Sequence, residues 1–254
     1  MRRTLIVGNW KANKTIAETE AYLKELPQFS ANWKHEVVIT PSFVNLETAS
    51  RHMPSNVKLG AQDLSQWPSG EHNGEVTATM LRAVGVQYCI VGHVERRQMG
   101  ETNTAINAKV KNCLSSDITP IICVGETLEE YNSDMTRVVL EKQIRSCLDG
   151  VKDFGKIVVA YQPVWTIGTG YYAAGDLANI IADFIRKTVQ KMTGNAMSSN
   201  FPILYGGGIT ASNAREYLET PEVDGLMVGP TSRTPQLLNE IVMTEFTIKK
   251  YADA

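Results

Sequence analysis

The segment KIVVAYQPVWTIGTG, residues 156–170, joins a polar side chain to a glycine-containing loop. Its first half is an apolar run of the kind that forms a buried strand. Gln162 follows, directly before Pro163, where a strand must end. In a barrel or sheet this position is the mouth, where catalytic groups are usually placed. Because an amide takes up no proton at neutral pH, the segment belongs either to a working active site or to a site without its base.

Polar residues or glycines follow other apolar runs in the same way: Asn9, Lys11, His93, Glu95, Glu126, Gly206, Gly207, Gly208 and Gly229. Lys11 is either a solvated loop lysine or a cation held over an anionic substrate. His93 is either a structural residue at the end of a strand or a catalytic residue. Glu95 and Arg96 are most simply an ion pair or an interface contact.

Three of these strand exits are rich in glycine: IGTG at 167–170, YGGGI at 205–209 and VGP at 228–230. Glycine frees backbone N–H groups to point at an anion, especially where a short helix begins, as expected at 210–213. Alone, each exit is equally a tight turn with positive φ. Three exits that converge in a barrel, the last two strands among them, indicate a phosphate site.

The elements that position these residues are eight short apolar runs: 4–10, 36–40, 57–62, 88–93, 119–126, 156–163, 201–208 and 224–229. They are rich in Val, Ile and Leu and mostly continuous, which is typical of parallel strands buried on both faces. Helical stretches separate them. Eight strand–helix units favour a (β/α)8 barrel over a doubly wound sheet, for which six strands usually suffice.

Apolar side chains recur at helical spacing in the intervening segments. Segment 15–29 carries such a stripe, and so does segment 103–116; the members are Ile16, Tyr22, Leu23 and Leu26, then Ile106, Val110, Cys113 and Leu114. A third helix, 176–192, is expected to begin with Asp176 as its N-cap. No linker or low-complexity tract divides the chain, which predicts one domain over residues 1–254.

Composition places the chain among ordinary globular proteins, with 43% hydrophobic and 20% charged residues. A net charge of −2 predicts no general attraction to nucleic acid or to a membrane surface. The start resembles a first strand more than a signal peptide. The four cysteines lie far apart without a CxxC pair, which favours reduced thiols in the cytoplasm over zinc or disulfides.

Six motifs stand in order across nearly the whole chain: GNWK at 8–11, GHVERR at 92–97, CVGE at 123–126, AYQPVWTIGTG at 160–170, YGGG at 205–208 and GLMVG at 225–229. Together they resemble the triosephosphate isomerase family. The resemblance implies a single TIM barrel and an isomerase of glycolysis and gluconeogenesis. Its substrate would be a small phosphorylated sugar, dihydroxyacetone phosphate or glyceraldehyde 3-phosphate, and no metal or organic cofactor is implied.

The resemblance also implies roles for the site residues. Lys11 would neutralise the substrate, Asn9 would orient it, and Glu95 would support the lysine and the histidine. His93, kept neutral by a helix N-terminus, would polarise the carbonyl. A glutamate at position 162 would move the proton between carbons. A lid would close over the site, with phosphate-binding amides at Gly168, Gly206, Gly207, Gly208 and Gly229; the lid consists of Pro163, Val164, Trp165, Thr166, Ile167, Gly168, Thr169 and Gly170.

The sequence departs from the family within the site. Gln162 replaces the glutamate base, and Val94 replaces a serine expected to bind that glutamate when the lid is open. Gly208 replaces another serine, and Pro230, which has no N–H, replaces a glycine. Tyr171 and Tyr172 are unusual after IGTG and predict altered lid closure. An engineered Glu→Gln change and natural divergence both explain Gln162, and the other departures favour divergence.

Three functions follow as alternatives. The first is an isomerase of the triosephosphate isomerase type, impaired by Gln162. The second is a paralogue for a larger sugar phosphate such as erythrulose phosphate, and the third is a catalytically silent protein that binds phosphorylated ligands.

A homodimer is expected, because segment 63–78 corresponds to the family's interdigitating loop. Asn73 would reach the partner's site, and Glu75 would pair with Arg96 across the interface. The alternative is a surface loop stabilised within one chain.

Overall fold

Eight parallel strands form a closed barrel in the order β1 to β8, with β8 pairing back onto β1. The structure is a computed structural model that describes residues 4–194 and 200–248. The strands are β1 Leu5–Asn9, β2 Glu36–Thr40, β3 Val57–Ala61, β4 Tyr88–Val91, β5 Thr119–Val124, β6 Val158–Tyr161, β7 Ile203–Tyr205 and β8 Gly225–Val228. Each lies within one of the eight apolar runs, so the predicted (β/α)8 barrel is confirmed.

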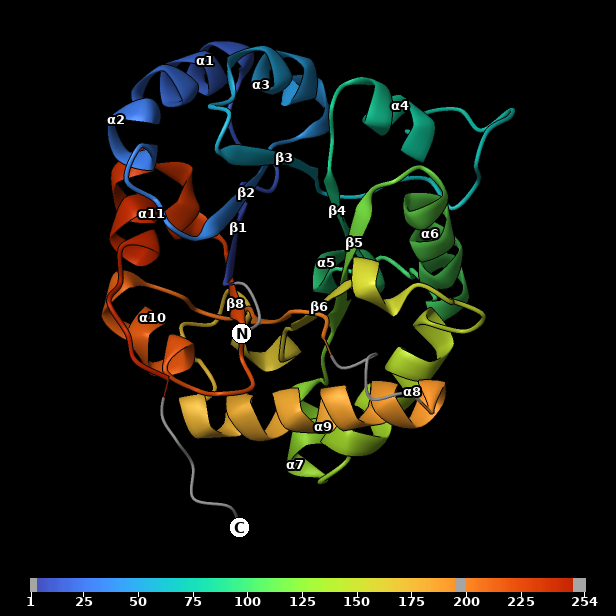
Figure 1. Cartoon of the computed structure of the whole chain (residues 1–254). Helices are drawn as coiled ribbons and strands as arrows, with labels where there is room; N and C mark the ends of the chain where they lie inside the picture. Colours follow the sequence, from blue (N-terminus) through green and yellow to red (C-terminus); the bar gives the residue numbers. More distant parts are fainter. Residues whose placement is uncertain (1–3, 195–199, 249–254) are drawn as a thin grey trace.

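Helices surround the strands as an outer layer (Figure 1). They are α1 Ile16–Glu25, α2 Pro27–Ser30, α3 Leu46–His52, α4 Ala78–Ala83, α5 Val94–Gln98, α6 Asn103–Ser115, α7 Leu128–Asn132, α8 Thr136–Cys147, α9 Gly175–Thr193, α10 Ala211–Leu218 and α11 Pro235–Val242. Short 3₁₀ turns lie at Phe43–Asn45, Phe154–Lys156, Val164–Thr166 and Pro230–Arg233.

Two buried layers explain why the strands read as continuous apolar runs. One cluster fills the barrel interior with side chains such as Leu5, Ile90 and Leu204. The other lies between the strands and the helices and includes Ile6, Val110 and Ile185. Alternate side chains of a strand point to opposite faces, so both faces are apolar.

Two details of the predicted helices are wrong. Ile16 is 52% exposed, because α1 buries the side that carries Thr19, Tyr22 and Leu23 and Ile16 lies off that side. The N-cap of α9 is Ala174, so Asp176 lies in the first turn, where a carboxylate still favours the positive end of the helix dipole. The stripe of α6 is as predicted, with Ile106, Val110 and Cys113 buried.

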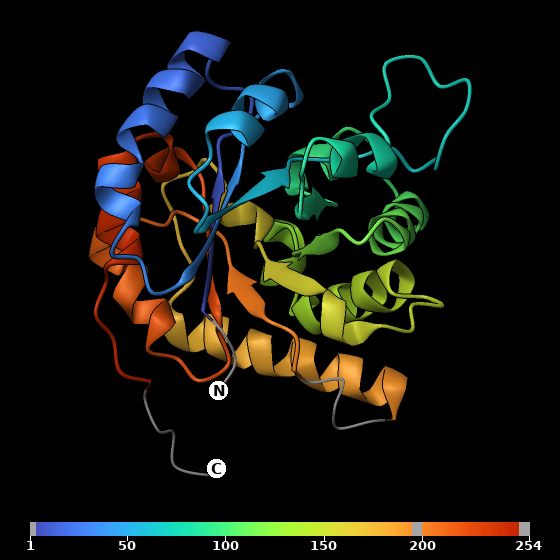
Figure 2. The ribbon, with the colours of Figure 1, turned by 45° about the horizontal axis from the view of Figure 1, so that its top comes forward.

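The loop between β3 and α4 extends away from the barrel (Figure 2). It is the segment predicted to interdigitate with a partner. Within the chain, Trp67 stacks on His72, with ring centroids 3.9 Å apart and planes inclined by 12°. The tip residues Asn73 and Glu75 are exposed.

Candidate functional site

A cavity of about 570 Å³ opens at the carboxyl ends of the strands. It is lined from β1, β4, β6, the lid, β7 and β8; the predicted site residues among its walls are Asn9, Lys11, His93, Gln162, Thr166, Ile167, Gly168, Gly170, Gly206, Gly207, Gly208 and Gly229. The fold thus brings together strand exits more than 200 positions apart, as the rule for barrel sites requires. Glu95 contacts Lys11 but does not itself line the cavity, and neither do Pro163, Val164, Trp165 and Thr169 of the lid.

Lys11 is held in an unusual backbone conformation, with a φ of 55°. Its N–H donates to Asn9 Oδ1 at 3.0 Å, and its carbonyl accepts from Gln62 Nε2 at 2.9 Å. Its Nζ lies 2.5 Å from Glu95 Oε1, and the two side chains are 30% and 47% exposed. Left-handed backbone at a non-glycine residue costs about 1–3 kcal/mol and clusters at functional sites. The strain here presents an ammonium group to the cavity.

His93 is the N-cap of α5, and its Nδ1 accepts from the backbone N–H of Glu95 at 3.3 Å. Burial, and after it the nearby Lys11 charge, lower the pKa of His93 to about 4, and Glu95 opposes both effects only in part. The imidazole is therefore neutral at pH 7. Since Nδ1 is an acceptor, the ring proton is on Nε2, which is then a donor for a ligand oxygen.

Gln162 is fixed by close contacts. Its backbone N–H donates to Val124 at 2.8 Å, and a Cβ on Gly125 would lie 1.9 Å from the Gln162 carbonyl oxygen. Its side chain is 4% exposed, and Nε2 donates to Met227 Sδ at 3.2 Å. Among the described residues, Oε1 has no hydrogen-bond partner. Position 162 thus has the place expected for a base, with an amide that cannot act as one.

Both ends of the lid are tied to the barrel by hydrogen bonds. Trp165 Nε1 and the Tyr161 hydroxyl each donate to Glu126 Oε1 at 3.0 Å, and burial raises the pKa of this fully buried carboxyl. At the other end, the N–H of Ala173 donates to the Tyr205 hydroxyl at 2.9 Å. The lid therefore lies over the cavity between two fixed anchors.

The packing at the glycine-rich end of the cavity explains why this chain has Gly208 where the family has a serine. Gly208 has a φ of 56°, and a Cβ there would lie 3.0 Å from the Tyr171 carbonyl oxygen. Tyr172 lines the cavity beside it. A serine at 208 would strain the backbone and crowd the lid, so Gly208 and the Tyr171–Tyr172 pair fit each other. Pro230 also lines this end and offers no N–H.

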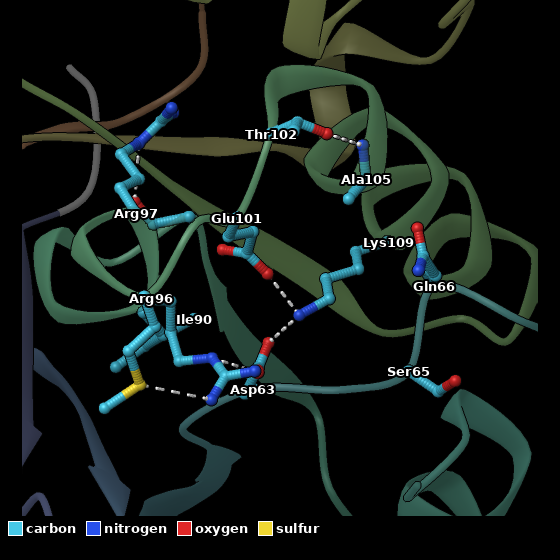
Figure 3. Close-up of polar contacts among 12 residues, drawn as sticks. Asp63, Ser65, Gln66, Ile90, Arg96, Arg97, Glu101, Thr102, Ala105 and Lys109 are labelled. Carbon is cyan, nitrogen blue, oxygen red and sulfur yellow. Dashed lines mark hydrogen bonds and ion pairs between the residues drawn. The ribbon is translucent and has the colours of Figure 1, made fainter. Parts of the chain in front are cut away.

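The residues predicted for an interface lie elsewhere, around a groove of about 540 Å³ that includes Glu75 and Arg96. Arg96 does not pair with Glu95; its Nε lies 2.9 Å from Asp63 Oδ2. Lys109 Nζ contacts Asp63 Oδ1 at 2.6 Å and also Glu101 (Figure 3). The simple pairing of Glu95 with Arg96 is therefore wrong.

The part of the chain at residues 4–194 and 200–248 has no group of three or more His, Cys, Asp or Glu side chains able to hold a metal ion. It also has no helix long and apolar enough to cross a membrane. The four cysteines are buried and free.

Several cavity residues escaped the sequence analysis: Met227, Ser212, Asn213, Glu216 and Thr231. Met227 reads as a core residue of an apolar run, and its contact with Gln162 joins positions 65 apart. The polar residues near 212 do follow a glycine-rich exit, which is the one signal that could have found them.

Comparisons with known proteins agree with this arrangement. The family model for triosephosphate isomerase matches residues 4–245. A triosephosphate isomerase of Dictyoglomus thermophilum is 41% identical over 247 residues, covering 95% of this chain and 99% of that protein. One of Clostridium acetobutylicum is 42% identical over 236 residues, covering 91% of this chain and 95% of that protein.

Proposed function

The chain belongs to the triosephosphate isomerase family, and we propose that it is an aldose–ketose isomerase for triose phosphates whose proton transfer is slowed by Gln162. The observation that carries the proposal is the convergence of Lys11, neutral His93 and position 162 on one cavity with a glycine-rich end. The substrate would be dihydroxyacetone phosphate or glyceraldehyde 3-phosphate.

The geometry supports a division of labour within the cavity. Lys11 would attract the substrate and, with the Nε2–H of His93, stabilise the negative oxygen that develops in an enediolate. A neutral imidazole suits this role because it donates a hydrogen bond without protonating the substrate outright. The amides of Gly168, Gly206, Gly207 and Gly229 would hold the phosphate. Pro230 withholds one further amide.

We expect the missing base at position 162 to limit the rate of isomerisation. A general base contributes roughly 10²–10⁴-fold to a rate, and an amide supplies none of it. The electrostatic groups remain, and these alone accelerate reactions to some degree. We therefore expect slow isomerisation rather than none.

Deuterium exchange tests this function directly. Dihydroxyacetone phosphate is incubated with the chain in D₂O, and deuterium at the hydroxymethyl carbon is followed by NMR. We expect uptake above the uncatalysed rate, proportional to protein concentration and lost in Lys11→Met. No uptake above the uncatalysed rate would reject the isomerase for triose phosphates and leave two candidates, a silent binding protein and an isomerase for a larger sugar phosphate.

The second candidate is a catalytically silent protein that binds phosphorylated ligands. It is favoured by Gln162 and by Val94, which is buried without a hydroxyl to offer a base at that position. A larger substrate, such as a tetrose phosphate, is the third alternative, and Gly208 with Pro230 favours it by altering the phosphate end. Exchange measured with both trioses and tetroses distinguishes the three.

We also propose a homodimer formed through the loop after β3. Large apolar side chains lie exposed near this loop, with Phe43 41% and Met99 77% exposed, and both line the groove that contains Glu75. Sedimentation equilibrium of the chain and of Met99→Lys tests the proposal. A monomeric unsubstituted chain at micromolar concentration would contradict it.

A further inference from the structure

The segment that carries Lys11 has a strained backbone at two positions. Lys11 has a φ of 55° and Lys14 has a φ of 73°, and neither residue is a glycine. Left-handed backbone is costly at a non-glycine residue and persists only where the surrounding structure holds it. The contacts that hold segment 11–14 therefore determine where the Lys11 ammonium group lies.

Side chains from the loops after β2, β3 and β8 hold this segment by hydrogen bonds. Gln62 Nε2 donates to the Lys11 carbonyl oxygen at 2.9 Å. Asn45 Nδ2 donates to the Lys14 carbonyl oxygen at 2.7 Å. A further contact comes from Arg233, which is charged, unlike the other two side chains. A guanidinium group carries several donors in a fixed plane, so it can join two loops at once.

Arg233 binds Asn13, the residue that closes the turn around Lys11. Arg233 Nη1 donates to Asn13 Oδ1 at 2.9 Å. The side-chain amide of Asn13 donates to the Trp10 carbonyl oxygen at 2.6 Å, and its backbone N–H donates to the Lys11 carbonyl oxygen at 2.9 Å. A guanidinium has no acceptor, so it selects the amide oxygen and leaves the amide nitrogen for Trp10. Arg233 thus stabilises the turn on both sides of Lys11.

The same arginine belongs to the turn at the glycine-rich end of the cavity. Arg233 Nε donates to the Pro230 carbonyl oxygen at 3.3 Å. Trp10 Nε1 donates to the Ser232 carbonyl oxygen of this turn at 3.2 Å. Pro230 and Thr231 line the cavity, whereas Arg233 is not among the described residues that line it. The loop with the cation and the turn with the glycine-rich end are therefore joined outside the cavity.

We infer that Arg233 is a positioning residue: by holding Asn13 it keeps Lys11 in its left-handed conformation and fixes the distance between the Lys11 ammonium group and the glycine-rich end of the cavity. Arg233 acts through Lys11 and does not touch the ligand. The inference deepens the proposed function and rests on it for the anionic ligand of the cavity. The competing explanation is that Arg233 attracts an anion by its charge alone.

Calorimetric titration with glycerol 3-phosphate at pH 7.5 tests the inference. We expect Arg233→Met to raise the dissociation constant about five- to tenfold, because Lys11 is then free to leave its position. Arg51→Met is the matched control: it removes the same charge from an exposed pair with Glu47 and should leave the constant unchanged. An unchanged constant in Arg233→Met, or an equal rise in both variants, would overturn the inference.

A double-mutant cycle with Lys11 separates positioning from direct attraction. In Lys11→Met the ammonium group is gone, so adding Arg233→Met is expected to raise the dissociation constant by less than about twofold. If Arg233 acted by its own charge, or if its loss merely loosened the fold, the rise would be the same in both backgrounds. That result would overturn the inference.

Asn13→Ala breaks the same contact from its other side, without changing the turn that contains Arg233. It removes the acceptor of Arg233 and the bond to Trp10, so it should weaken binding at least as much as Arg233→Met. Adding Arg233→Met to Asn13→Ala should then change the constant by less than about twofold. Additive losses would contradict the inference.

The dissociation constants do not depend on turnover, so the two proposals fail separately. Expected constants without deuterium uptake would reject the proposed isomerase and support the positioning role. Deuterium uptake without an effect of Arg233→Met on affinity would reject the positioning role alone. Failure of the unsubstituted chain to bind glycerol 3-phosphate would overturn the positioning role as well.

Discussion

Two lysine–carboxylate clusters lie in this barrel, and they differ in what surrounds them. Lys11 contacts one carboxylate, Glu95, and these side chains are 30% and 47% exposed at the mouth of the cavity. Lys109 contacts two, Asp63 and Glu101, and the three side chains are 6%, 15% and 6% exposed (Figure 3). The residue types are the same, while the environments are opposite.

The difference separates a structural cluster from a functional one. Burial alone would lower the pKa of Lys109, yet Asp63 and Glu101 together raise it above its ordinary value. The charge of Lys109 is therefore neutralised by two carboxylates of the same chain, Asp63 and Glu101. Lys11 contacts one partly exposed carboxylate, and it is the one lysine or arginine among the described residues that line the cavity. Such a group remains available to an anionic ligand.

The largest expected effect is on stability, from Lys109→Met. Removing the cation leaves two buried carboxylates without it, and breaking a buried pair costs about 3–5 kcal/mol. Urea denaturation measures the loss in the free energy of unfolding. Lys11→Met is the control, and a partly exposed pair is expected to cost less than about 1 kcal/mol. Equal losses in the two variants would remove the distinction.

The next effect is the pH dependence of stability that His93, in the cavity cluster, should add between pH 4 and 6.5. The pKa of His93 is about 4 in the folded chain and about 6.5 in an unfolded one. Unfolded chains then bind more protons, so stability is full above pH 6.5 and falls by about 3 kcal/mol as the pH drops toward 4. His93→Gln should lack this component when both are melted across the range. A parallel pH profile in the two proteins would be evidence against a neutral buried imidazole.

A smaller effect is expected on ligand affinity. Charge-assisted hydrogen bonds contribute about 1.5–3 kcal/mol, so Lys11→Met should weaken glycerol 3-phosphate binding roughly 10- to 100-fold in calorimetry. A milder change in the buried cluster, Asp63→Asn, should leave the dissociation constant unchanged. Loss of affinity in Asp63→Asn with Lys11→Met unaffected would reverse the roles of the two clusters.

The smallest effect is expected on the binding of an anion by backbone N–H groups, which does not depend on a lysine. Pro230→Gly and Pro230→Ala each restore a backbone N–H at the glycine-rich end. One such hydrogen bond is expected to tighten inorganic phosphate binding about five- to tenfold. The alanine variant separates the N–H from added flexibility. No gain in either variant would show that this position does not face the anion.

The sequence predicted the barrel because both faces of its strands are buried, which leaves continuous apolar runs such as 36–40 and 119–126. It also identified the strand-end residues that meet in the cavity, since barrel topology alone gathers them. No sequence pattern predicted the contacts between side chains that are far apart in the chain. The pairing of Gln162 with Met227 and that of Lys109 with Asp63 depend on packing between elements.

The other wrong predictions concern residues whose type suits more than one environment. Ile16 fits a helical stripe by spacing, yet in the first turn of α1 the buried side chain is that of Thr19. Asp176 is a good N-cap by type, yet the N-cap of α9 is Ala174, two residues earlier. Helix and capping propensities indicate which residue types are suited to a buried or capping position. Tertiary packing determines which residue occupies that position in the fold.

We propose that this cavity is a complete isomerase site apart from the base at position 162. The most direct test compares kcat/KM for triose phosphate between the unsubstituted chain and Gln162→Glu. We expect a rise of about 10²- to 10⁴-fold, the usual contribution of a general base. No rise, in a variant that folds and still binds glycerol 3-phosphate, would contradict it and show that Val94, Gly208 and Pro230 have already changed the chemistry of the site.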